Sequence, residues 1–145
     1  MFKHILVPTD GSRLSEKAVK QAVRLAAQIG ARLTAFHVIP RRHPSGSQMQ
    51  LLRMTAGDPT PTRQQHARRF LRYAERAAAA AKVDCATKQV TSDHPYKAIV
   101  AEAQQHGCDL ILMASHGRRG IEGFLLGSET QKVLTHSRVP VLVYR

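Results

Sequence analysis

Short apolar runs alternate with helix-forming segments along the whole chain, and this alternation constrains the fold more than any other feature. The apolar runs predict buried strands, and they cover residues 3–8, 32–39, 83–90, 109–114 and 140–144. The helix-forming segments lie between them, at about 13–29, 63–82, 95–106 and 128–136. Strands that alternate with helices form a parallel sheet covered by helices on both faces. The sequence therefore predicts an α/β fold of the open, Rossmann-like type.

A chain of 145 residues suits a single domain, here spanning 1–145. Its first helix has a capping serine, Ser12, and a stopping glycine, Gly30. The residues expected to form the buried face of this helix are Leu14, Ala18, Ala22, Leu25, Ala26 and Ile29. Residues 40–62 hold four prolines and two glycines and are predicted to form a long variable loop, with a helical turn around 48–54.

The charge is strongly basic, with 22 Lys and Arg against 10 Asp and Glu, a net +12. Such an excess favours a polyanionic partner, such as a phosphorylated ligand or nucleic acid. Half of the excess lies in residues 41–76, which hold eight arginines and only two acids, Asp58 and Glu75. The partner of this segment is not named by the sequence.

Several classes of protein are excluded or disfavoured. No apolar run approaches the roughly 20 residues that span a bilayer, and the first residues lack a signal-peptide core, so a cytoplasmic protein without membrane contact is expected. Cys85 and Cys108 lack metal-ligand spacing and are expected to be buried thiols. The eight histidines form no HxH or HxxxH pair, so no metal site is predicted.

The segment after the fourth predicted strand carries the clearest chemical signal. Nine residues separate Gly117 from Gly127-Ser128, where the last helix begins. Glycines let backbone N–H groups approach phosphate oxygens, and a helix N-terminus adds partial positive charge. The alternative is that these glycines only form turns and Ser128 only caps the helix. Neither GxxxxGK[ST] nor GxGxxG is present, so the P-loop and dinucleotide patterns are excluded.

Three segments together resemble the universal stress protein family over nearly the whole chain. They are the opening strand and turn at 4–12, the pattern G-x-x-G, nine residues, G-[ST] in the loop after 109–114, and the closing strand at 138–144. The chain has Ala114 where the family has the first glycine of that pattern.

The resemblance implies a five-stranded sheet in the order 3-2-1-4-5, as in adenine nucleotide α-hydrolase-like folds, and bound ATP or AMP. Asp10 would bind a ribose hydroxyl, beside Pro8 and Thr9, and Val38 and Met113 would pack on the adenine. Around the phosphates the resemblance places Gly117, Gly127, Ser128 and Thr130. Ala114 would lie beside the ribose, and His116 in the same loop is a further candidate contact to a phosphate. It also implies a homodimer, and the apolar edge strand 140–144 is expected to pair with its copy.

The leading interpretation is therefore a nucleotide-binding stress-response regulator. No nucleophile–base pair or hydrolytic carboxylate pair is evident, so no catalytic residue is assigned. ATP hydrolysis is expected to be slow at most, with Mg²⁺ arriving on the triphosphate. Two alternatives remain open: an adenine-nucleotide-using α/β enzyme, and a basic nucleic-acid-binding protein.

Overall fold

A computed structural model of the protein describes residues 1–41, 60–118 and 126–145. In chain order, the elements are β1 His4–Pro8, α1 Arg13–Ile29, β2 Arg32–Ile39, α3 Thr60–Ala80, β3 Cys85–Thr91, α4 Pro95–Gln105, β4 Leu110–Ala114, α5 Ser128–His136 and β5 Val141–Tyr144. The strands form one parallel sheet in the order β3-β2-β1-β4-β5. The predicted fold class and strand order are both confirmed.

β1 is the central strand and is hydrogen-bonded on both edges. It pairs with β2 from His4–Arg32 to Pro8–Phe36, and with β4 at Ile5–Leu110 and Leu6–Ile111. The side chains of Ile5, Leu6 and Val7 have no exposed surface. A strand covered on both faces needs apolar side chains on both, which explains the unbroken apolar run in the sequence.

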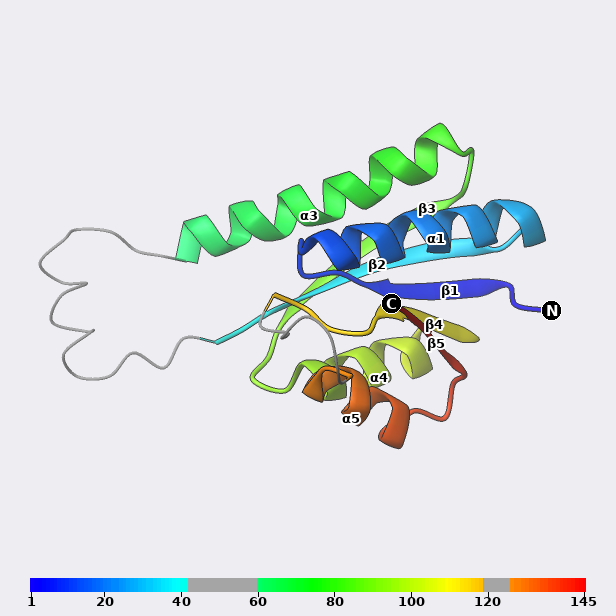
Figure 1. Ribbon diagram of the computed structural model, residues 1–145. Coiled ribbons are helices and arrows are strands. Elements are labelled where there is room, and N and C mark those ends of the chain that lie inside the picture. Colours follow the sequence, from blue (N-terminus) through cyan, green and yellow to red (C-terminus); the bar gives the residue numbers. More distant parts are fainter. Residues whose placement is uncertain (42–59, 119–125) are drawn as a thin grey trace, which may run out of the picture.

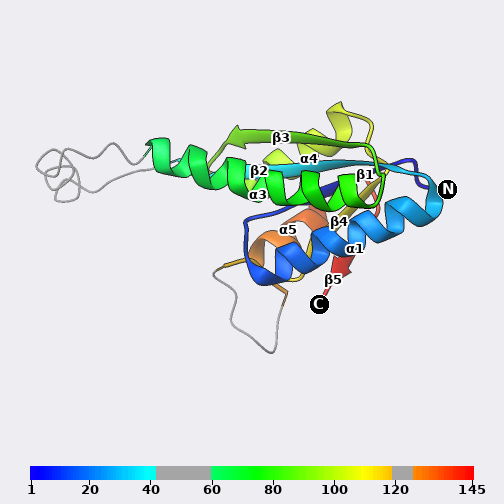
Figure 2. The same ribbon diagram turned by 90° about the horizontal axis from the view of Figure 1, so that it is seen from above.

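Helices cover both faces of the sheet. Figure 1 shows α1 and α3 on one side and α4 and α5 on the other, and Figure 2 shows α1 and α3 side by side when seen from above. One apolar cluster joins Val7, Ala35 and Leu112 to α1 and α3, and a second joins Leu6, Phe36 and Ile111 to α4 and α5. Alternate residues of β1, β2 and β4 thus belong to opposite cores.

The local signals around α1 act as predicted. The Ser12 hydroxyl accepts a hydrogen bond from the Ser15 N–H at 3.2 Å, and Gly30 ends the helix in the left-handed conformation. One member of the predicted buried face is wrong, because Ile29 is 37% exposed. It is the last residue of α1, directly before the C-cap Gly30.

The bounds of one helix and one strand differ from those that the sequence predicts. The helix predicted at 63–82 is α3, Thr60–Ala80, which shortens the loop predicted at 40–62; the helical turn predicted at 48–54 lies outside the described residues. The strand predicted at 83–90 is β3, Cys85–Thr91. Its first residue shifts because the N–H of Val83 still donates to the carbonyl of Ala78, which closes α3.

The described helices include none that is both long enough and apolar enough to cross a membrane.

At the amino ends of the strands, the carboxylate of Asp109, directly before β4, binds the backbone at the start of β1. Asp109 accepts the N–H groups of Lys3 and His4 at 2.8 and 2.9 Å. Burial raises the pKa of Asp109, but these hydrogen bonds outweigh it and the pKa lies below its usual value of 3.8.

We expect Asp109→Asn to lower the free energy of unfolding by about 1 kcal/mol at pH 7, because the amide offers one oxygen acceptor instead of two and carries no charge. The folded-state pKa is lowered, so the stabilisation is present above pH 3.8 and is lost as the pH falls through the folded pKa. Urea unfolding at several pH values checks this. Asp84→Asn, at an exposed carboxylate, is the control, and equal effects of the two variants would contradict the prediction.

Candidate functional site

The candidate site lies at the carboxyl ends of β1 and β4, where the strand order changes direction. From β1 the chain enters α1 on one face of the sheet, and from β4 it leads to α5 on the other face. Two connections that diverge to opposite faces leave a crevice between them, the usual ligand site of an open α/β sheet. The segments that border it are residues 9–12 after β1, and residues 115–118 with 126–127 after β4.

Asp10 bridges these two segments through both oxygens of its carboxylate. Oδ1 accepts the N–H of Ser12 at 3.0 Å, and Oδ2 accepts the N–H of Arg118 at 2.8 Å. Gly117 approaches Asp10 so closely that an added Cβ would overlap Oδ2. A residue with any side chain at position 117 would therefore displace the carboxylate or the loop.

The hydrogen bonds also determine the charge of Asp10. Burial raises the pKa of this carboxyl, but the bonds from Ser12 and from the Arg118 backbone outweigh burial and hold the pKa below 3.8. Asp10 is therefore an ionised acceptor at neutral pH. Its Asx-turn bond to Ser12 coexists with the bridge to the second loop.

Thr9 is held rigidly beside Asp10. It is 5% exposed, its N–H donates to the carbonyl of Phe36 at 2.9 Å, and its hydroxyl lies 3.1 Å from that of Ser15. Pro8, half-buried, pairs with Phe36 at the end of β1. The backbone at 8–10 thus forms a fixed border of the crevice.

Val38 and Met113 are brought together on one face of the sheet. Both belong to the apolar cluster under α4 and α5; Met113 is 6% exposed and Val38 is half-buried. Ala114, the next residue of β4, belongs instead to the cluster under α1 and α3. The methyl group that replaces the family glycine therefore points to the face opposite Val38 and Met113.

The start of α5 is joined to the end of β4 by hydrogen bonds. Gly127 caps the helix and its N–H donates to the carbonyl of Ser115 at 2.7 Å. An added Cβ at Gly127 would lie 3.1 Å from the Cα of His116. The hydroxyl of Thr130, 3% exposed, donates to the carbonyl of Ala114 at 3.0 Å. In this arrangement Thr130 positions β4 against α5, while Ser128 is exposed in the first turn.

Glu129 is the only acid in the first turn of α5, and it is directed away from the loop. Its carboxylate accepts the N–H of Tyr96 at 2.8 Å, at the start of α4, and lies 3.3 Å from the ammonium of Lys132. The negative charge of Glu129 therefore lies between α4 and α5, and it does not oppose an anion at the N-terminus of α5.

His116 is half-buried in the loop, with Nδ1 3.1 Å from the hydroxyl of Ser115. The guanidinium of the neighbouring Arg118 lies 4.7 Å from the ring centre of Phe70, so it stacks on α3. Arg119, with the rest of 119–125, is outside the described residues. No group of three or more His, Cys, Asp or Glu able to hold a metal ion occurs in the described parts of the chain.

Sequence reasoning missed two residues beside the crevice, Phe70 and His37. Phe70 is 6% exposed, covers Gly11 and meets the ring of His37 edge-on at 5.3 Å. His37 Nδ1 donates to the carbonyl of Thr9 at 2.8 Å. Burial lowers the pKa of His37, as does the charge of Arg118, whereas the bond to Thr9 and the charge of Asp10 raise it less, leaving it below 6.5. No short motif links residues 33 positions apart, so the sequence carried no signal for this contact.

The comparisons with known proteins identify the family. The sequence matches the universal stress protein family over residues 1–145, so the chain belongs to that family. Universal stress protein YxiE of Bacillus subtilis is 31% identical, with all of both chains covered. The solved structure of MJ0577 from Methanocaldococcus jannaschii has a TM-score of 0.81 at 26% identity and covers 99% of this chain and 95% of its own. A universal stress protein solved in complex with cAMP has a TM-score of 0.69 at 27% identity and covers 99% of this chain and 97% of its own.

The contact between Gly117 and Asp10 predicts a non-additive pair of substitutions. Gly117→Ala alone should lower the free energy of unfolding by about 1–3 kcal/mol, because the added methyl group would overlap the half-buried carboxylate of Asp10. In an Asp10→Ala background most of that cost should disappear. Urea unfolding of the four proteins measures the coupling. Gly107→Ala, at a glycine with open space around its Cβ position, should add independently to Asp10→Ala; full additivity at Gly117 would contradict the contact.

The lowered pKa of His37 predicts a pH-dependent stability. As the pH falls below about 6.5, the unfolded chain takes up the proton before the folded one does, so the free energy of unfolding falls. His37→Asn keeps a donor for the Thr9 carbonyl but does not titrate. Its thermal unfolding temperature should fall less between pH 7 and pH 5 than that of the unsubstituted protein. An unchanged slope would show that His37 does not titrate in this way.

Proposed function

We propose that this chain binds an adenine nucleotide in the crevice between β1 and β4 and acts as a nucleotide-dependent regulator in stress response. The observation that carries the proposal is the ionised carboxylate of Asp10, held at the point where the strand order changes, directly against Gly117. A fixed carboxylate at a strand end is a suitable acceptor for a ribose hydroxyl. The relative bound to cAMP, at 27% identity, supports an adenine nucleotide as the ligand.

The residues divide into three groups by the part of the nucleotide that each would contact. Asp10 binds the ribose, since a carboxylate has about four acceptor positions and can hold a ribose hydroxyl besides its two N–H donors. Val38 and Met113 pack on the adenine from the α4–α5 face, with Pro8 and Thr9 at its edge. Residues at the phosphates are His116, Gly117, Gly127 and Ser128, with Ala114 and Thr130 fixing the backbone beneath them.

The residues present fit this ligand. The methyl group of Ala114 lies in the core under α1 and α3, so it does not reduce the space beside Val38 and Met113. The carboxylate of Glu129 is engaged with Tyr96, so the dipole of α5 remains favourable to phosphate. With ATP, Mg²⁺ would arrive on the phosphate oxygens and would supply charge neutralisation there. The natural ligand is ATP or AMP, and hydrolysis is slow at most.

The same proposal includes a cytoplasmic homodimer formed through β5. Among the strands that the structure describes, β5 pairs with β4 alone and forms one edge of the sheet. Leu142 in this strand is 43% exposed. An apolar edge strand tends to pair with another chain, and pairing of two 140–144 segments by a two-fold axis would cover both.

Nucleotide binding is tested first on the protein as purified. Mass spectrometry of the small molecule released on denaturation should find an adenine nucleotide, and millimolar AMP or ATP should raise the thermal unfolding temperature of nucleotide-free protein. Asp10→Ala should weaken binding by at least tenfold in titration calorimetry, because it removes a charged hydrogen-bond acceptor.

Asp84→Asn removes an exposed carboxylate elsewhere and should bind as the unsubstituted protein does. If neither AMP, ATP nor cAMP shifts the unfolding temperature and no nucleotide is released, the proposal is wrong. Rapid conversion of ATP to AMP and pyrophosphate, lost in Asp10→Ala, would instead indicate an enzyme.

A further inference from the structure

The outer surface of α3 carries four exposed arginines: Arg68, Arg69, Arg72 and Arg76. We call this surface the arginine face. Arg68, Arg72 and Arg76 are four residues apart, which is about one helical turn or 6 Å along the axis. Together they place positive charge along roughly 12 Å of the helix surface.

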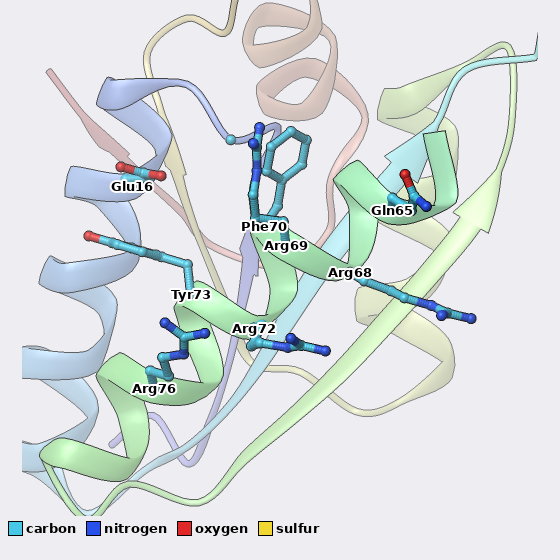
Figure 3. Close-up of a pocket in the computed structure, with 9 residues that line it drawn as sticks. Glu16, Gln65, Arg68, Arg69, Phe70, Arg72, Tyr73 and Arg76 are labelled. Atoms are coloured by element: carbon cyan, nitrogen blue, oxygen red, sulfur yellow. The ribbon is translucent and has the colours of Figure 1, made fainter. Parts of the chain in front are cut away.

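The arginine face borders a cavity of about 590 Å³ that also includes residues of α1 and of the loop before it. Figure 3 shows Tyr73 directed from α3 toward α1, and Arg68 and Arg72 directed to the side away from α1. Gly11 and Glu16 border the cavity on the α1 side. The cavity therefore lies beside the row of arginine side chains on α3.

This charge is poorly neutralised by the protein itself. In the part of the chain that the structure describes, Arg68, Arg72 and Arg76 form no ion pair. Glu16 is the single acid at the cavity. Glu75, on α3, accepts the hydroxyl of Thr87 at 3.1 Å and thus lies on the β3 side. Like charges one turn apart destabilise a helix slightly, so the row favours an anionic partner.

The choice of arginine over lysine on α3 indicates which kind of anion the surface binds. α3 contains five arginines and no lysine, although lysines occur on α1, β3, α4 and α5. The planar guanidinium forms two parallel hydrogen bonds to a phosphate, which the ammonium of lysine does not. A regular row of arginines matches a chain with phosphates at regular intervals. Few aromatic residues are available for stacking on bases, so contacts to the backbone would dominate.

We propose that the arginine face binds nucleic acid through its phosphate backbone, without reading the base sequence. Arg68, Arg72 and Arg76 contact successive phosphates, and the cavity beside Tyr73 accommodates the sugar-phosphate chain. The row of arginines is distinct from the adenine side of the nucleotide crevice, because α3 covers the face of the sheet opposite Val38 and Met113. The two sites are neighbours, since Gly11 and Phe70 border both the cavity and the crevice. The basic excess of the sequence is therefore assigned to a second ligand.

The test uses the full chain and a fluorescein-labelled 20-nucleotide DNA of mixed sequence, single-stranded or as a duplex. Anisotropy titrations from 0.05 to 0.3 M NaCl give the dependence of the association constant on salt. Substituting Arg68, Arg72 and Arg76 together by Gln should weaken binding at least tenfold at 0.1 M salt. The slope of log K against log salt should become shallower by about 2 for the single strand and about 3 for the duplex.

The matched control substitutes Lys97, Arg138 and Arg145 by Gln, which removes the same charge from exposed positions outside α3. It should retain most of the affinity and the slope. Equal losses in both triple variants would overturn the proposal in favour of general charge attraction, as would binding that is absent at 0.15 M salt. Tighter competition by polyglutamate or inorganic polyphosphate than by unlabelled DNA, at equal charge, would also overturn it. The thermal shift with AMP, retained in the arginine variant, would show that the two sites are independent and that the variant is folded.

Discussion

The rest of the structure depends on the burial of β1. Ile5, Leu6 and Val7 lose all contact with water, so both faces of the sheet must be covered and both edges of β1 must be paired. Covering both faces requires chain connections that leave the sheet in opposite directions. The crevice at the carboxyl ends of β1 and β4 is a direct consequence of that requirement. The position of the candidate site is thus determined by the way the core is closed, before any specific side chain is considered.

Asp10 holds the two loops that border this crevice in fixed positions. Its carboxylate joins two loops that are 108 residues apart in sequence, and the N–H groups that it accepts keep it ionised. Gly117 is required for the joint because no side chain fits between the loop and the carboxylate. At the other end of the crevice, the carboxylate of Glu129 accepts a hydrogen bond from the N–H of Tyr96 at the start of α4. Its negative charge therefore does not oppose an anion at the start of α5. The electrostatics of the site are therefore asymmetric, with one fixed acceptor and one helix N-terminus.

Much of the fold could be predicted because its signals are local. The end of β2 follows from an apolar run that stops before Pro40, and the start of α5 follows from Gly127. The bounds of α1 follow from Ser12 and Gly30. The start of α3 was predicted three residues late, since Pro61 reads as a loop residue although proline is tolerated in a first helical turn. The candidate site was predicted less completely. Thr130 was expected at the phosphates, but its hydroxyl is bonded to Ala114, a contact that depends on how α5 docks against β4.

By itself the sequence determined the layers of the fold, the elements that make it and the residue types at the strand ends, because these depend on spacing along the chain. It also determined that basic charge is concentrated between residues 41 and 76. Only the tertiary structure decided which residues meet: Phe70 over Gly11 and against His37, Asp10 against Gly117, and Ala114 and Met113 on opposite faces. The structure also places part of this basic charge, the arginines of α3, in a row beside a cavity. The physical reason is that such contacts follow from the packing of elements distant in sequence, and packing is set by the shape of the whole core.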